Sequence, residues 1–189
     1  NCLSIDGDTS TNDMVSVMAN GEAGNEMITS EGDAYDVFAQ ALYIVMMNLT
    51  RKLAADGEGA SKLLECHVTE APDQKTAITV AKSVIRSPLF KCAMFGEDAN
   101  CGRILCAIGY ADAEFDIKKV DVDLSSAYGR MAFCRNGAFV AFSEEEAAKL
   151  LAEKEIMIWI SLHQGEAAAT AWGCDLTYDY VKINGDYRS

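Results

Sequence analysis

The sequence IMIWISL, residues 156–162, decides the fold of this 189-residue chain. Its residues alternate in two sets, Ile156, Ile158, Ile160 and Leu162 against Met157, Trp159 and Ser161. A period of two is the spacing of a β-strand, and apolar residues in both sets indicate that the strand is well buried. The segment therefore predicts a strand packed inside a folded domain.

The residues around this strand predict further elements. Ser143 and Glu146 have the spacing of a capping box, which predicts a helix over residues 144–152. Residues 165–180 are typical of another strand followed by a polar turn. The last ten residues, YVKINGDYRS, are expected to be irregular.

The first two thirds of the chain alternate between helical and strand patterns. Apolar residues at helical spacing predict a long helix over residues 34–53, a helix opened by Pro72 and ending near Ile85, and a third over residues 102–110. Strands are expected at residues 1–5, 64–68 (half exposed), 89–95, 115–124, 130–134 and 138–142. The alternation predicts an α/β or α+β class, and the length predicts one domain over residues 1–189.

The charge of the chain excludes several partners. Its 29 acidic and 16 basic residues give a net charge of -13, so neither nucleic acid nor an anionic membrane surface is expected to bind. No apolar run is long enough to cross a membrane. We expect a cytoplasmic protein.

Cysteine and histidine do not form a recognisable metal or disulfide pattern. The seven cysteines are odd in number and have no close pairs, and His67 and His163 stand alone, so no metal or other cofactor is expected. There is no GxSxG or GxGxxG motif. From the residues alone, the polar glycine-bearing loops at 6–13, 56–59 and 96–102 are the best candidates for function.

These loops also carry a resemblance to a known family. The segments are IDGDTSTND (5–13), DGEGASK (56–62), FGEDANCGRI (95–104) and AWGCDLTYDYVKINGDYRS (171–189). Together they resemble the ornithine acetyltransferase family over nearly the whole chain. The resemblance implies the C-terminal, or beta-chain, portion of a self-cleaving precursor. It also implies a two-layered α/β sandwich completed by the alpha chain, in an alpha2beta2 or larger assembly.

The resemblance further implies an activity. Enzymes of this family move acetyl from N-acetylornithine to glutamate by a ping-pong reaction through a threonine nucleophile, and many also use acetyl-CoA. An N-terminal threonine suits this role because its own amine can act as the base. Both the threonine and the oxyanion hole are expected to lie outside residues 1–189, so no catalytic residue is assigned in this chain.

Three positions match places where the family contacts its amino-acid substrate: Glu58, Asn184 and Ser189. Glu58 can pair with an ammonium group, Asn184 can donate and accept hydrogen bonds, and Ser189 offers a hydroxyl. Read without the resemblance, Glu58 is a solvated loop acid and the other two are fraying terminal residues.

The chain also departs from the family pattern. Cys101 stands where many relatives carry tryptophan, and Ser189 where many carry threonine. Two other functions stay open at this point. One is a non-catalytic partner subunit, and the other is an amidase or peptidase in which water accepts the acyl group.

Overall fold

The computed structural model describes residues 2–187. Its contacts divide the chain into two units. The first, the sheet unit, contains the segment through Gly7 and the chain from Thr50 onward; the second, the 8–49 unit, runs from Asp8 to Leu49. No residue of the 8–49 unit is buried, and the expectation of one domain over residues 1–189 stays a prediction.

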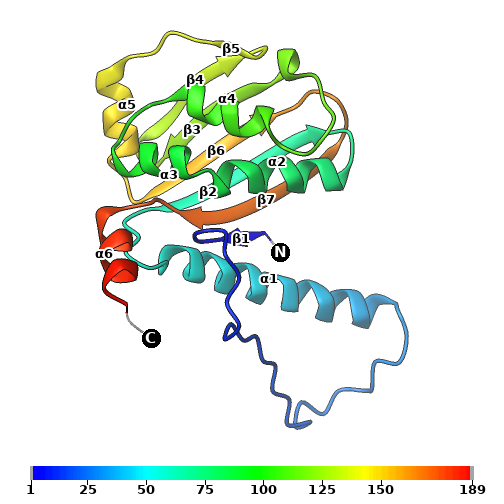
Figure 1. Ribbon diagram of the computed structural model, residues 1–189. Coiled ribbons are helices and arrows are strands. Elements are labelled where there is room, and N and C mark those ends of the chain that lie inside the picture. The colour runs from blue at the N-terminus through cyan, green and yellow to red at the C-terminus, as the bar shows by residue number, and fades with distance from the viewer. Residues whose placement is uncertain (1, 188–189) are drawn as a thin grey trace. The chain divides into compact units, whose positions relative to one another are not determined.

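The sheet unit is built on a mixed sheet of seven strands in the order β1-β7-β2-β6-β3-β4-β5 (Figure 1). β1 runs parallel to β7 and β2 parallel to β6, while the other neighbours are antiparallel. The strands are β1 (Leu3–Ser4), β2 (Leu63–Ala71), β3 (Asp121–Ser126), β4 (Gly129–Arg135), β5 (Ala138–Phe139), β6 (Glu155–Ser161) and β7 (Ala167–Cys174).

The strand predicted from IMIWISL is confirmed and is central. β6 lies between β2 and β3, and Ile156 and Ile158 are fully buried. The α/β fold class is confirmed as well, because helices cover this mixed sheet. β2, expected to be half exposed, is more buried than that, since its first four residues are all buried. A strand between two neighbours, with helices over one face, exposes little side-chain surface.

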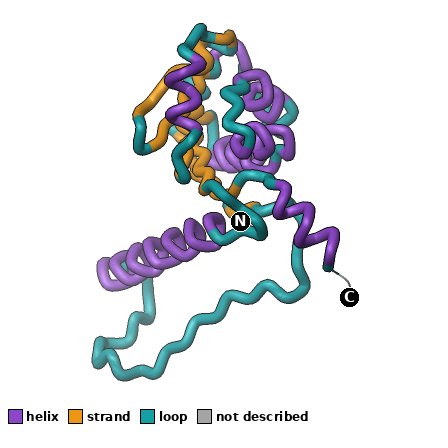
Figure 2. Tube along the Cα trace, turned by 90° about the vertical axis from the view of Figure 1, so that its left-hand side faces the viewer, coloured by secondary structure: helices purple, strands orange, loops and turns teal. Residues whose placement is uncertain are grey.

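Three helices cover the same face of the sheet (Figures 1 and 2). They are α2 (Gln74–Arg86), α3 (Pro88–Phe95) and α4 (Cys101–Gly109), and a fourth helix, α5 (Glu144–Leu151), packs beside β3 and β4. Their apolar residues meet those of the strands in one core, which includes Val84, Phe90, Ile104, Leu124 and Ile158. The predicted helices at 144–152 and 102–110 are therefore confirmed.

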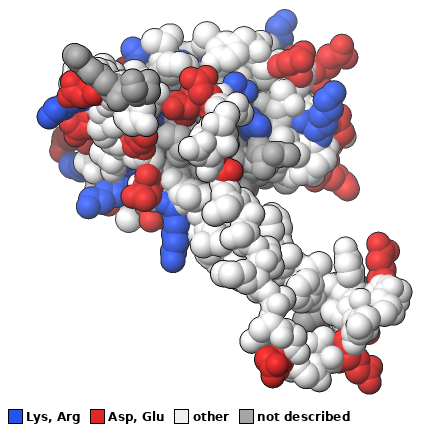
Figure 3. Space-filling view, turned by 60° about the horizontal axis from the view of Figure 1, so that its bottom comes forward, with Lys and Arg blue, Asp and Glu red and all other residues white. Residues whose placement is uncertain are grey.

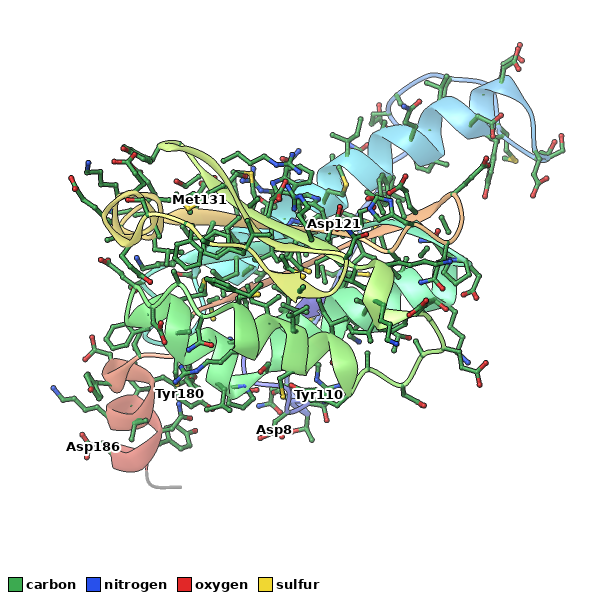
Figure 4. All side chains as sticks on the ribbon, turned by 90° about the horizontal axis from the view of Figure 1, so that it is seen from above. Asp8, Tyr110, Asp121, Met131, Tyr180 and Asp186 are labelled. Atoms are coloured by element: carbon green, nitrogen blue, oxygen red, sulfur yellow. The ribbon has the colours of Figure 1, made fainter. Side chains whose placement is uncertain are left out.

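The opposite face of the sheet carries polar and aromatic side chains. The ring of Trp159 stacks on His67 at 4.3 Å, and the guanidinium of Arg130 lies 5.0 Å from the Trp159 ring centre. Figure 4 shows Tyr110 on the side of the helices and Asp121 toward this second face. This second face, the open sheet face, is thus polar, whereas the first face is apolar and covered by α2, α3 and α4.

The long helix predicted over residues 34–53 is confirmed as α1 (Asp33–Ala55). Its large apolar side chains are exposed; Val37, Phe38 and Val45, for example, are 69%, 59% and 54% exposed. Figure 3 shows the mostly uncharged surface of the 8–49 unit, with acidic side chains gathered toward one end. Among the described residues, α1 included, no helix has the combined length and apolarity that crossing a bilayer requires.

One predicted strand is wrong, and another begins later than predicted. Residues 89–95, expected to form a strand, form helix α3, because Ser87 caps its first turn and Pro88 takes the first helical position. Short apolar runs do not distinguish the two states by periodicity. Of the expected strand 115–124, the first part is a loop with a 3-10 turn at Ile117–Lys119, and β3 begins only at Asp121.

Two helix boundaries also differ from expectation. Pro72 does not open α2; Asp73 caps it instead, its carboxylate accepting a hydrogen bond from the Thr76 amide at 2.8 Å. The tail, expected to be irregular from Tyr180 onward, is helix α6 (Tyr178–Asp186). Thr177 caps α6, and this cap was not recognised in the sequence because the residues around it were taken for a polar turn.

Candidate functional site

One end of the sheet brings together three segments that are distant in the sequence. β2 and β7 are antiparallel and β1 is parallel to β7, so the start of β2 lies at the same end as the ends of β7 and β1. The loop before β2, the helix after β7 and the loop after β1 therefore meet there. These segments carry Glu58, Asn184 and Asp6, respectively.

The loop that holds Glu58 approaches α6 closely. Gly59 has a positive φ of 66°, and a side-chain carbon at this position would lie 2.5 Å from the Tyr180 amide nitrogen. Only glycine allows both this backbone angle and this approach. The hydroxyl of Thr177 donates to the Gly59 carbonyl at 2.6 Å and accepts from the Tyr180 amide at 3.2 Å. The cap of α6 thus also binds the loop that carries Glu58.

This packing brings two of the three predicted site residues into contact. The side-chain amide of Asn184 donates to the Glu58 carboxylate at 2.9 Å and to the Tyr180 carbonyl at 3.0 Å. Glu58 and Asn184 are 126 residues apart in the sequence, and both are exposed. The third, Ser189, lies outside the described residues.

Sequence reasoning missed a further carboxylate at this place. The Tyr180 hydroxyl donates to Asp6 at 3.1 Å, so α6 contacts both Asp6 and Glu58 (Figure 4 labels Tyr180). The sequence marked the loop 6–13 as a candidate. That Asp6 in this loop contacts Tyr180 follows only from the structure, in which the tail is a helix. Two carboxylates, a phenol and an amide at one place suit a small cationic ligand with hydrogen-bonding groups.

A buried carboxylate fixes the ends of the strands beneath this cluster. Asp175, 2% exposed, accepts hydrogen bonds from the amides of Ser61 and Lys62 at 2.8 and 3.0 Å, and from the Ser61 hydroxyl. These contacts hold the start of β2 against the residues that lead from β7 into α6. The loop of Glu58 and the helix of Asn184 are consequently attached to one rigid base.

The third candidate loop has a local role in the described residues. Asn100 caps α4 by accepting from the Arg103 amide at 3.1 Å, and Glu97 pairs with Lys62 at 3.0 Å. Cys101, the departure from the family pattern, packs in the core, where burial raises the pKa of its thiol to about 11. These contacts stabilise the fold.

Both histidines contact side chains of the open sheet face. His67 meets the Thr170 hydroxyl at 3.0 Å, and burial is the main cause that lowers its pKa, against the opposing effect of Glu65. His163 lies between Glu70 and Asp121 at 2.9 and 3.1 Å. Within residues 2–187 there is no cluster of three or more His, Cys, Asp or Glu side chains that could hold a metal ion.

Two hollows lie elsewhere on the sheet unit. A cavity of about 180 Å³ on the open sheet face is lined by residues such as Asp123, Arg135 and Trp159. A wider one of about 530 Å³ lies between α2 and the chain after α4, beside Lys82 and Tyr110. Neither of these two is lined by Glu58 or Asn184.

The fold and this cluster define an α/β protein whose segments at one end of a mixed sheet bring together two carboxylates, a phenol and an amide. Comparison with known proteins makes this specific. A model of the ArgJ family matches residues 1–189, and the chain belongs to that family.

Individual relatives agree with the family assignment. The chain is 52% identical to the arginine biosynthesis bifunctional protein ArgJ of Caldanaerobacter subterraneus and 50% identical to ArgJ 1 of Clostridium acetobutylicum, each over all of its 189 residues. It is also similar to the crystal structure of the arginine biosynthesis bifunctional protein argJ from Bacillus halodurans. That match has a TM-score of 0.90 and 44% identity, and covers 98% of this chain and 86% of that one.

The lengths of these relatives differ in an informative way. The chain spans about half the length of the curated relatives, 47% and 46% for the two named here. The Bacillus halodurans chain, by contrast, is only slightly longer than this one, as its 86% coverage shows. This chain is thus one part of a longer protein.

Proposed function

We propose that this chain is the carboxyl-terminal portion of a glutamate N-acetyltransferase and supplies the part of its pocket that binds the ornithine group. The family and the relatives named for arginine biosynthesis support this proposal. The observation that carries it is the 2.9 Å contact between Glu58 and Asn184. The resemblance assigned these two positions to substrate binding, and they meet although 126 residues separate them.

The proposed reaction has two steps. A threonine hydroxyl outside this chain attacks the acetyl carbonyl of N-acetylornithine, the C–N bond breaks, and ornithine leaves with the proton on its amine. The amine of glutamate then attacks the acetyl-threonine ester and restores the free hydroxyl. Glu58 and Asn184 hold the amino-acid part of each substrate, and Ser189 is proposed to join them.

The electrostatics of the cluster fit this order of binding. Ornithine carries a side-chain ammonium group that glutamate lacks, and the carboxylates of Glu58 and Asp6 attract a cation. Glutamate, an anion, needs instead a donor, and the amide of Asn184 supplies one by exchanging its hydrogen bond to Glu58 for one to the substrate. The carboxylates thus bind ornithine, and after ornithine leaves, the amide donor binds glutamate in the same site.

A complementary chain is proposed to complete the enzyme. About half of the relatives' length is missing here, and the solved Bacillus halodurans chain is similarly short, as expected if the precursor cleaves itself. The 8–49 unit, with its exposed apolar side chains, fits an interface with that other portion. We propose an alpha2beta2 or larger assembly in the cytoplasm.

Mass spectrometry and an acetyl-transfer assay test this function together. The precursor is expressed whole, purified and weighed, and we expect two chains, the smaller headed by threonine. The assembly should transfer acetyl from N-acetylornithine to glutamate, while residues 1–189 alone should be inactive because they lack the nucleophile and oxyanion hole. Transfer to water would identify an amidase, absence of any acyl transfer would identify a non-catalytic subunit, and either result contradicts the proposal.

A further inference from the structure

A lysine is buried directly beneath the proposed site. Lys91, on α3, is 2% exposed. Its ammonium group donates to the carbonyl of Cys174 at 2.5 Å and to the carbonyl of Ile5, and lies 3.6 Å from the Cys174 sulfur. A buried ammonium group is costly unless such acceptors surround it, so these contacts specify a particular arrangement of the chain.

The acceptors belong to the segments that carry the site. Ile5 directly follows β1 and precedes Asp6, and Cys174 ends β7, three residues before the cap of α6. Lys91 therefore links two strand ends that are 169 positions apart (174 minus 5).

The loop of Glu58 rests on the same two residues. A side-chain carbon at Gly57 would lie 2.8 Å from the Cys174 sulfur and 3.1 Å from the side chain of Ile5. The backbone of this loop thus packs directly against the two residues that Lys91 binds. A shift of either residue would displace Glu58 relative to Asn184.

We propose that Lys91 is a positioning residue for substrate binding, which fixes Glu58, Asp6 and α6 in the arrangement that receives the ornithine group. This inference rests on the function proposed above, and adds to it a residue that does not touch the substrate. A cation beneath the loops also attracts the carboxylate of Asp6. Burial lowers the pKa of Lys91, and the nearby Cys174, Asp175 and Asp6 oppose that shift.

The chain supplies a matched control in Lys62. It too is a buried lysine, 7% exposed, and its ammonium group donates to the Leu151 carbonyl and to Glu97 at 3.0 Å. These partners lie at the end of α5 and after α3, and neither belongs to the loop of Glu58 or to α6. Replacing either lysine by methionine removes a buried ammonium group of equal size. The bond of Lys62 to Asp175 comes from its backbone amide, which methionine keeps, so only Lys91→Met removes an ammonium group that binds beneath the site.

The experiment compares Lys91→Met and Lys62→Met in the assembled enzyme. We expect Lys91→Met to raise KM for N-acetylornithine by roughly 10- to 100-fold, since displacing a binding group by about 1 Å costs on that order. Lys62→Met should leave KM within about twofold, even where both variants lower the thermal midpoint equally. Equal KM values for the two variants would overturn the inference.

A double-mutant cycle with Glu58→Gln tests the route of the effect. If Lys91 acts by placing Glu58, the rise in KM caused by Lys91→Met should largely disappear when Glu58→Gln is already present. Fully additive effects would contradict that route. Should Lys91→Met fail to assemble, Lys91→Gln, which keeps a neutral donor, replaces it under the same criteria.

Failure of this inference can be told apart from failure of the proposed function. If the parent enzyme does not transfer acetyl from N-acetylornithine to glutamate, the proposed function fails. Amide exchange at residues 57–60 then still reports on Lys91: faster exchange in Lys91→Met than in Lys62→Met supports its hold on the loop, and equal exchange opposes it. If the parent enzyme is active and the two lysine variants behave alike, only the inference fails.

Discussion

The two units of this chain treat their apolar residues in opposite ways. In the sheet unit, large side chains such as Phe90, Phe133 and Ile158 are fully buried in one core. In the 8–49 unit, Val37, Phe38 and Val45 are more than half exposed on a regular helix. Burial stabilises by about 25 cal/mol per Å² of apolar surface, so the sheet unit is stabilised by its own chain while the 8–49 unit is not. The difference is that the described residues cover the apolar side chains of the sheet unit and leave those of the 8–49 unit exposed.

The largest expected effect comes from placing a charge on α1. Leu49→Glu should abolish assembly with the complementary chain and hence acetyl transfer, because an unpaired carboxylate in an apolar interface is strongly unfavourable. Leu89→Glu on α3 is the control, as the two leucines are 53% and 60% exposed. Co-purification measures the result. Assembly by both variants, or by neither, would remove the contrast between the units.

The next effect concerns stability, and here a substitution in the sheet unit should have the larger effect and one in the 8–49 unit the smaller. Phe133→Ala, in the core, should lower the unfolding free energy of the sheet unit by about 3–5 kcal/mol. Val45→Ala, on the exposed helix, should change the stability of the isolated chain by less than about 0.5 kcal/mol. Denaturant titration of residues 1–189 compares them. A similar loss from both would mean that the 8–49 unit packs against something within the chain.

Removal of Gly185–Ser189 sharpens the comparison within the sheet unit. The last turn of α6 buries no residue, so the thermal midpoint of the assembled enzyme should change little. Acetyl transfer should nevertheless fall by one to two decades, on the order expected for displaced binding groups, because Asn184 loses its helical support. Full activity would exclude the tail from the pocket, and a large fall in midpoint would make its role structural.

The smallest expected effect is a helix cap that depends on pH. The hydrogen bond from the Thr76 amide is the main cause that lowers the pKa of Asp73. The carboxylate therefore stabilises the fold above the ordinary carboxyl pKa of about 3.9, and this contribution disappears as the pH falls through the lowered value. Asp73→Ala should lower the midpoint at pH 7 but not at a pH below that lowered pKa, while Asp73→Asn keeps an acceptor and should lose less. A difference between parent and Asp73→Ala that persists at low pH would contradict this account.

Periodicity predicted the elements whose apolar residues recur at regular spacing, whether the structure buries them or not. β6 with its alternating isoleucines and α1 with its helical spacing are both where the sequence placed them. α3 was mistaken for a strand, since eight residues are too few to show a period and the Ser87-Pro88 pair was taken only as the end of α2. The resemblance supplied Glu58 and Asn184, whereas their contact and the role of Asp6 depend on tertiary structure.

Replacing Glu58 in the assembled enzyme tests the central claim most directly. Glu58→Gln keeps the size of the side chain and removes its charge, and Asp56→Asn makes the same change two residues earlier in the exposed loop. Losing a charge-assisted hydrogen bond costs about 1.5–3 kcal/mol, so kcat/KM for N-acetylornithine should fall by roughly one to two decades in Glu58→Gln alone. Precursor cleavage should be intact in both variants. Kinetics of Glu58→Gln that match those of the parent enzyme would show that this loop does not bind the substrate and would contradict the account.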